Sequence, residues 1–322
     1  MGRASYIRKR LILSVFVLFG VTVLIFGMAH FLPGDPAMIL LGERATTQNI
    51  ALLREQLGLN RSLPEQYWLF ISGLVQGQMG TSLQFRQPVR DMVVSRVPIS
   101  IGLTVYAMGL AAVITLIFGL LAAANKDRWV DQVIRVAFLF ILTTPNFWFG
   151  ILLILVLSLG LKWFPVAGFG ATFQEHIWYL FLPALTLSLQ LSSVLIRNLR
   201  SQVIYIGRSD FVRTARAKGL PERLVLVRHV LRNALLSTVT IFGLQFGFLV
   251  GGTLVIETVF AVPGMGQLLF TSITSHDYPV VQAIVVVSAI MVIIVNLVVD
   301  LSYSFCCELS ARCGLRSPRL RC

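Results

Sequence analysis

Six long apolar stretches run through the chain, and short polar segments separate them. Each stretch is long enough for a helix rising about 1.5 Å per residue to cross a hydrocarbon core of about 30 Å. An open chain satisfies its own backbone in lipid only as a helix. The pattern therefore predicts an all-α, polytopic membrane protein with six transmembrane helices. The predicted spans are Leu11–Leu32, Val97–Asn125, Val136–Leu161, Ile177–Ile196, Ala234–Ile256 and Tyr278–Val299. Pro145 and Pro183 are predicted to interrupt the third and fourth spans, because proline removes a backbone hydrogen bond and can kink a helix.

The first stretch could be taken for a signal peptide, but Leu11–Leu32 has 22 residues without a formal charge. The apolar core of a signal peptide has about 7–15 residues and is followed by a cleavage site of small residues. No clear site of that kind follows Leu32. This stretch is therefore predicted to stay in the protein as its first span.

The basic residues are distributed unevenly among the predicted loops. With the N-terminus in the cytoplasm, the cytoplasmic segments hold 20 of the 27 Lys and Arg residues, and the outer segments hold the other seven. Lys and Arg accumulate in the cytoplasmic loops of membrane proteins. Both termini are therefore predicted to be cytoplasmic.

Composition agrees with a chain surrounded by membrane lipid. Charged residues make up 13% of the sequence, against about 25% in soluble domains. The net charge of +13 would also suit a nucleic-acid-binding protein. Most of the bases lie in short loops between apolar stretches, however, and the orientation of the spans explains them. No nucleic-acid partner is predicted.

The largest outer segment, residues 33–96, contains two patterns of helical spacing. Ile50 and its apolar neighbours follow Asn49, which is a suitable N-cap. Tyr67 and further apolar residues follow Pro64, and glycines at 77 and 80 end that pattern. The segment is predicted to form short amphipathic helices on the outer face, and a plain solvated loop is the alternative. The predicted domains are 1–94 (first span and outer segment), 95–305 (five-helix core) and 306–322 (tail).

The sequence contains no recognisable catalytic, cofactor or metal site. The four cysteines lie at positions 306, 307, 313 and 322, where no histidine accompanies them as a zinc site would require. The four histidines are far apart in the sequence, and the phosphate-binding loop, the H-E-x-x-H motif and the G-x-S-x-G motif are all missing. No cofactor is predicted, and the chain is not expected to be an enzyme.

The most informative segment is the cytoplasmic loop between spans four and five, residues 200–233. Ser209 or Asp210 can cap a short helix, and Gly219 can end it in a left-handed conformation. Pro221 then suits the first turn of a second helix. A short helix held rigidly below the membrane can transmit force, whereas a mobile loop cannot.

Side chains in the same segment support a helix with two distinct sides. Phe211 and Ala215 are four residues apart and are predicted to share one face, while Arg213, Arg216 and Lys218 place positive charge near the helix C-terminus. A basic loop that only fixes the orientation of the spans would explain the charges equally well. The residues alone leave these two interpretations open.

Two motifs in this segment resemble a known family. Thr-Ala-Arg-Ala-Lys-Gly at 214–219 and His-Val-Leu-Arg-Asn-Ala at 229–234 are similar to the coupling loop of binding-protein-dependent ABC permeases. The match is to the dipeptide, oligopeptide and nickel subfamily. In the family's general pattern, Glu-Ala-Ala falls on residues 213–215 and the glycine on Gly219. The later hydrophobic-x-Leu-Pro falls on His229, Leu231 and Arg232, a departure that this subfamily shares.

Further matches follow the same order as in the subfamily over nearly the whole chain. The sequence departs from the pattern at Ser237, where the family often has proline, and in a tail without the usual Asp-Pro-Arg ending. The role of the tail is therefore open. The matching positions are Leu32–Pro36, Gln56–Leu59, Gly80–Ser82, Pro145, Phe147, Trp163–Pro165, Glu257–Phe260, Pro263–Gly266, Asp277–Pro279, Gln282 and Asn296–Asp300.

The resemblance implies a type I ABC importer permease fold in the bacterial inner membrane, with a loop that docks in a groove of the cytoplasmic ATPase. It also implies four partners: a second permease that forms a heterodimer with this chain, two ATPase subunits, an extracytoplasmic solute-binding protein and membrane lipid. The solute stays open among dipeptides, oligopeptides, glutathione, nickel chelates and sugars. The residues assigned to ATPase coupling are Asp210, Phe211, Arg213, Thr214, Ala215, Arg216, Ala217, Lys218, Gly219, His229, Leu231, Arg232 and Asn233.

A second group of residues is assigned to a gate or to packing, and the two interpretations have equal weight. Glycines four residues apart let helices approach closely, either at a moving contact or in static packing. A carboxylate near the end of span five can hold the outer loop by accepting backbone N–H bonds. The group consists of Gly243, Gly247, Gly251, Glu257, Pro263, Gly264 and Gly266.

Two other functions compete with an importer permease. A stand-alone secondary transporter would need ionisable groups near the midplane and repeat symmetry, and the predicted spans contain no charged residue. A membrane enzyme or assembly protein would need a polar constellation facing one compartment, and none is evident.

Overall fold

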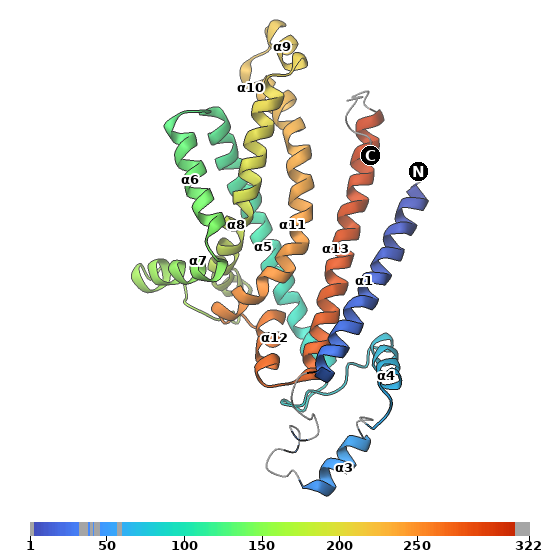
Figure 1. Cartoon of the computed structure of the whole chain (residues 1–322). Helices are drawn as coiled ribbons and strands as arrows, with labels where there is room; N and C mark the ends of the chain where they lie inside the picture. Colours follow the sequence, from blue (N-terminus) through green and yellow to red (C-terminus); the bar gives the residue numbers. More distant parts are fainter. Residues whose placement is uncertain (1–2, 32–37, 39–40, 42–45, 57–59, 313–322) are drawn as a thin grey trace. The chain divides into compact units, whose positions relative to one another are not determined.

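The computed structural model describes the chain except for residues 1–2, 32–37, 39–40, 42–45, 57–59 and 313–322 (Figure 1). The described residues form helices, with one isolated bridge between Thr81 and Pro88. The helices are α1 (Arg3–Phe31), α3 (Thr47–Gln56), α4 (Leu63–Val75), α5 (Val89–Ala124), α6 (Trp129–Thr143), α7 (Asn146–Leu153), the π-helix η2 (Ile154–Gly160), α8 (Phe173–Gly207), α9 (Asp210–Ala217), α10 (Glu222–Leu224), the π-helix η3 (Val225–Leu231), α11 (Arg232–Val259), α12 (Met265–Thr274) and α13 (Tyr278–Arg312).

The chain divides into two compact units. The first comprises Met1–Ser100 with Pro263–Leu297, and the second comprises Ile101–Val262 with Val298–Cys322. Helix α5 continues without a break through the predicted domain boundary at residues 94–95, so the division into 1–94, 95–305 and 306–322 stays a prediction. Within the described residues, five helical segments are long and apolar enough to span a membrane, or six if the bent α6–α7–η2 pair is one span.

In the first unit, α4 packs against α1 as an amphipathic helix should. Ser62 and Glu65 form a capping box at its start. The Tyr67 hydroxyl lies 2.9 Å from Thr22 Oγ1 of α1, and its ring packs edge-on against Phe26. The predicted short helices are therefore present.

The start of α3 corrects the capping prediction. This helix begins at Thr47, and the Asn49 N–H donates to Thr46 Oγ1 at 3.3 Å. Thr46, not Asn49, therefore caps the helix, because the first helical turn lies closer to the N-terminus than the apolar spacing indicated.

A buried carboxylate joins two distant segments of the first unit. Asp277, directly before α13, accepts hydrogen bonds from the Ser82 hydroxyl and from the N–H groups of Leu83 (3.1 Å) and Gln84 (3.3 Å). A buried charge is stabilised by several such donors. The contact joins two motifs of the resemblance, around Ser82 and around Asp277, although 195 residues separate them.

In the second unit, the third predicted span, Val136–Leu161, is broken next to Pro145, as predicted. Helix α6 ends at Thr143, and the α7–η2 segment that follows is bent by 112° relative to it (Figure 1). Thr144 is extended (φ −89°, ψ 136°) because it precedes Pro145, and proline disfavours helical geometry in the residue before it. Apolar composition alone could not locate this break, since residues on both sides of it are equally apolar.

Helix α8 is the centre of the second unit and packs against α6, α7 and α11. It runs unbroken from Phe173 to Gly207 through the buried Pro183, so the interruption predicted there does not occur. Gly150 allows α7 to lie close to its neighbours. A Cβ on Gly150 would meet Phe260 Cε2 at 3.1 Å and Thr186 Cγ2 at 3.5 Å.

Candidate functional site: the α9 coupling segment

The segment between α8 and α11 has the predicted helix–break–helix form. Ser209 is extended before α9, although its hydroxyl donates to the Ile206 carbonyl (2.6 Å) instead of capping the helix. Gly219 follows α9 with φ +75°, the left-handed conformation that glycine adopts without strain. Pro221 directly precedes α10, and the chain then continues through η3 into α11.

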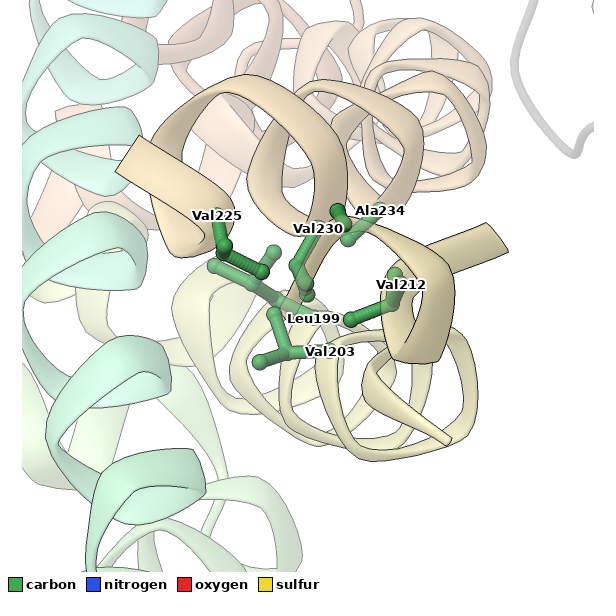
Figure 2. Close-up of a cluster of buried hydrophobic side chains, with 7 residues drawn as sticks. Leu199, Val203, Val212, Val225, Val230 and Ala234 are labelled. Carbon is green, nitrogen blue, oxygen red and sulfur yellow. The ribbon is translucent and has the colours of Figure 1, made fainter. Parts of the chain in front are cut away.

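An apolar cluster fixes α9 to the rest of the second unit (Figure 2). Val212 and Ala215, three residues apart on α9, are its contributions to the cluster. Burial of each valine is worth roughly 1.5–3 kcal/mol, so the cluster holds α9 firmly. The remaining buried members come from α8, η3 and α11: Leu199, Val203, Val225, Val230 and Ala234.

Phe211 and Ala215, four residues apart on α9, differ in burial. Phe211 is 48% exposed, whereas Val212 has no exposed surface. The buried side of α9 is therefore set by Val212 and Ala215. Phe211 lies outside the cluster because α9 packs through the neighbouring side of the helix.

A charged brace closes the turn between α9 and α10. Arg216 donates from Nε (3.0 Å) and Nη2 (2.6 Å) to the Glu222 carboxylate, and from Nη1 to the Gly207 carbonyl (3.3 Å). The hydrogen bonds to Glu222 raise the pKa of the Arg216 guanidinium above its ordinary value. The bidentate geometry fixes direction as well as distance. Sequence reasoning assigned Arg216 to the helix dipole and missed Glu222.

The outward side of α9 combines one aromatic ring with charge. Phe211 is accompanied by the exposed residues Asp210, Arg213, Thr214 and Lys218. The Arg213 guanidinium lies 3.8 Å from the Asp210 carboxylate, and both side chains are largely in solvent. Aromatic and arginine side chains are enriched where proteins contact one another. Ala217, Arg216 and Gly219 are also exposed on this segment.

The remaining predicted coupling residues lie behind α9. His229 and Leu231 belong to η3, while Arg232 and Asn233 begin α11. Asn233 Nδ2 donates to the His229 carbonyl at 2.6 Å, where the helix changes from π to α geometry. Of these residues, Leu231 packs against the apolar cluster that holds α9, whereas Arg232 is exposed.

The gate-or-packing residues are not brought to α9. Gly243, Gly247 and Gly251 follow one another along α11, and a Cβ on Gly251 would meet no heavy atom within 4 Å among the described residues. Glu257 is buried in the last turn of α11, where its main-chain carbonyl accepts the Val262 N–H at 2.8 Å.

The others surround the start of α12 in the first unit. Pro263 and the extended Gly264 lead into this helix, and Gly266 is buried in its first turn. The Met265 N–H donates to Ser100 Oγ at 2.8 Å.

One charged pair near α9 was not predicted. Asp131 on α6 is fully buried against Arg200 on α8, at 2.6 Å and 2.5 Å between the paired atoms. Both residues lie outside the predicted spans, so no local pattern pointed to their contact. Their separation of 69 residues could be bridged only by the fold.

Comparison with known families identifies the chain. Residues 115–306 match the family described as binding-protein-dependent transport system inner membrane component. The chain belongs to this family. Residues 4–104 match the N-terminal part of such membrane components, so the two matches together span most of the chain.

Curated relatives of this permease match along nearly their whole length. The glutathione transport system permease protein GsiC of Escherichia coli strain K12 is 41% identical over 300 residues, which is 93% of this chain and 96% of GsiC. GsiC of Escherichia coli O6:H1 strain CFT073 and of Salmonella choleraesuis strain SC-B67 match with the same identity and coverage.

A solved structure supports the fold of the permease. A chain from the crystal structure of an amino acid ABC transporter with histidines aligns with a TM-score of 0.51 at 14% identity. The alignment covers 66% of this chain and 92% of that one. At this identity the likeness concerns the fold alone.

The protein is therefore the permease subunit of an ABC importer of the peptide and nickel subfamily, and it is a multi-pass protein of the inner membrane. ATP hydrolysis takes place in partner subunits, so the permease itself is not an enzyme. Family membership implies an ATPase and a solute-binding protein as partners. The stand-alone secondary transporter is not favoured.

Proposed function

We propose that this permease imports glutathione or short peptides related to it, and that α9 is the element through which ATPase subunits drive it. The cargo is proposed because relatives 41% identical over 93% of the chain are glutathione transport permeases. The resemblance of segment 200–233 to a coupling loop supports the role of α9.

The proposed coupling role rests on how firmly α9 is held against the rest of the second unit. Val212 and Ala215 hold one side in an apolar cluster, and the Arg216–Glu222 brace holds its C-terminal end. The other side exposes Phe211, Arg213 and Lys218. A helix fixed in this way passes a push from a partner to α8 and α11 and does not absorb it by bending.

We propose that both termini and α9 are cytoplasmic, which the ATPase role requires. Contacts within each unit support the alternation of the spans. Asp277 contacts the segment at Ser82, and the Gly168 N–H donates to the Phe260 carbonyl at 3.0 Å, each contact joining two segments expected outside. Asp131 and Arg200 join two segments expected inside.

The assembly we propose contains a second, similar permease, two ATPase subunits and an extracytoplasmic solute-binding protein. Six spans form half of a pathway, so a second permease completes it. The glycines of α11 provide a surface for close approach. At Gly251 and Gly252 a Cβ would have no heavy atom within 4 Å among the described residues. This surface and the α12 turn are proposed as parts of the gate.

Reconstitution in vesicles with the ATPase subunits and the solute-binding protein of the same transporter tests the coupling role. Phe211→Asp places a charge on the exposed side of α9 without changing its buried side. It is expected to lower solute-stimulated ATP hydrolysis about tenfold or more, as loss of a contact hot spot does. Tyr205→Ala, an exposed aromatic residue near the end of α8, is the control and should leave hydrolysis unchanged.

Uptake of labelled glutathione by the same vesicles tests the cargo. Uptake should require ATP inside the vesicle for hydrolysis and should fall when unlabelled glutathione is in excess. Uptake that continues without the ATPase subunits would establish a secondary transporter. ATP-dependent uptake of another peptide but not of glutathione would retain the importer and change its cargo.

A further inference from the structure

The buried ion pair between α6 and α8 is bidentate. Arg200 donates from Nε to Asp131 Oδ1 (2.6 Å) and from Nη2 to Oδ2 (2.5 Å). Asp131 Oδ2 also accepts the Asp127 N–H at 3.0 Å, and the Asp131 side chain has no exposed surface. The carboxylate is therefore fully supplied with donors, and its position is determined by them.

The position of Arg200 on α8 joins two contacts. The preceding residue, Leu199, is a member of the cluster that holds α9, and Val203 one turn later belongs to the same cluster. Arg200 itself points to the start of α6. The same turn of α8 therefore contacts α9 through its apolar side chains and α6 through its charge.

Helix α6 also has an apolar contact with α8, in which Ile134 and Phe138 pack with Ala122 and Ile196. Apolar contacts are non-directional and permit one helix to slide or rotate against another. Two parallel N–H···O bonds do not permit this, because both distances and the plane of the guanidinium are set. The ion pair therefore fixes the register that the apolar cluster leaves adjustable.

We infer that Asp131 and Arg200 are positioning residues that make α6 move with α9 as one body during transport. The inference rests on the proposed role of α9. Movement of α9 then reaches α6 directly at its first turn. At the other end of α6, the chain bends into α7, which contacts Thr186 of α8 and Phe260 beyond α11 at Gly150. Through α6, the pair thus connects the α9 segment with the contact of α7 at Gly150.

A distance measurement in the assembled transporter tests the inference. The four tail cysteines are replaced by serine, and spin labels are attached to cysteines placed at the exposed positions Gln132 (α6) and Arg223 (α10), the latter next to Glu222, which Arg216 of α9 binds. In the labelled protein that keeps Asp131 and Arg200, the distance between the labels should be the same with and without ATP. With Asp131→Asn, the distribution should broaden or shift with ATP, and the ATP hydrolysed per solute should rise about fivefold or more.

Three variants separate positioning from simple stability. The exchange of Asp131→Arg with Arg200→Asp should restore both the ATP-independent distance and the ratio of ATP to solute. Arg200→Lys keeps the positive charge but loses the two-donor geometry of the guanidinium. This variant should fold and still show a partly raised ratio of ATP to solute. Lys126→Gln removes the partly exposed ion pair that Lys126 forms with Asp127 in the same loop. It should change neither the label distance nor the ratio of ATP to solute.

The outcomes distinguish this inference from the proposed function. Suppose that Asp131→Asn and Arg200→Lys change neither the label distance nor the ratio of ATP to solute, while Phe211→Asp is still impaired. This result would overturn the positioning role of the Asp131–Arg200 pair and leave the coupling role of α9 intact. Unimpaired Phe211→Asp would overturn the role of α9. If the double variant Asp131→Arg with Arg200→Asp assembles normally but stays uncoupled, the positioning role of the pair would also be overturned.

Discussion

At the residue scale, α9 depends on a single backbone conformation. Gly219 has φ +75°, and the chain must turn there for Arg216 to meet Glu222 beyond the break. A residue with a Cβ in this conformation costs about 1–2 kcal/mol. The same glycine is part of the family motif, so the resemblance and the backbone geometry have a common physical cause.

Two glycines make this argument testable, because at both Gly219 and Gly207 a Cβ would have open space. They differ in that only Gly219 has a positive φ. Gly219→Ala is expected to destabilise the end of α9 by about 1 kcal/mol, whereas Gly207→Ala should be neutral or stabilising by up to about 1 kcal/mol. Hydrogen exchange of the α9 amides measures both effects. Equal effects at the two positions would contradict the assigned left-handed turn.

At the element scale, the bend between α6 and α7 changes what the third apolar stretch does. Pro145 allows the bend by removing a backbone donor, and packing at Gly150 holds α7 against its neighbours. The 15 residues of α6 make a segment of about 22 Å, shorter than the hydrocarbon core. The stretch is therefore not a simple straight span.

Substitution at Gly150 tests the packing of α7. Gly150→Leu would overpack the contact with Phe260 and Thr186 and should lower stability by about 1–3 kcal/mol. Ile151→Leu, at the neighbouring exposed position, should be nearly neutral. Thermal unfolding of the purified complex in detergent measures the difference. Full stability of Gly150→Leu would indicate that α7 does not pack closely against Phe260 and Thr186.

At the scale of the whole molecule, the alternation of the spans determines which partner each segment can reach. The proposed orientation places α9 and the α5–α6 loop at Lys126 in the cytoplasm. It places the loop at Arg86, which precedes α5, outside. The positive-inside bias and the same-side contacts within each unit support this arrangement.

Cysteine labelling tests the orientation, since the native cysteines all lie at positions 306–322 and can be replaced by serine. Arg86→Cys should react with a membrane-impermeant maleimide in spheroplasts. Lys126→Cys and Thr214→Cys should react only after the membrane is permeabilised. Mass shift of the protein on a gel measures the reaction. Reaction of Thr214→Cys from outside would remove α9 from the reach of any cytoplasmic ATPase.

Much of the helix pattern could be predicted from local features, and the exceptions have specific causes. Glycine and proline interrupt helices through local effects, so Gly219 and Pro221 made the break after α9 predictable. The burial of Val212 and Ala215 and the exposure of Phe211 could not be predicted, because burial depends on Leu199 and Val225, which no local spacing includes. The Asp131–Arg200 pair was missed for the same reason.

The sequence by itself determined that the chain is a helical membrane protein with a helix–turn–helix before span five, and its ordered motifs identified the family. These features follow from apolar length, the placement of bases and turn residues, all of which act over a few neighbouring positions. Only the tertiary structure decided the angle of the bend in the third stretch, the buried side of α9 and the carboxylate contacts of Asp131 and Asp277. Each of these depends on atoms brought together from distant parts of the chain.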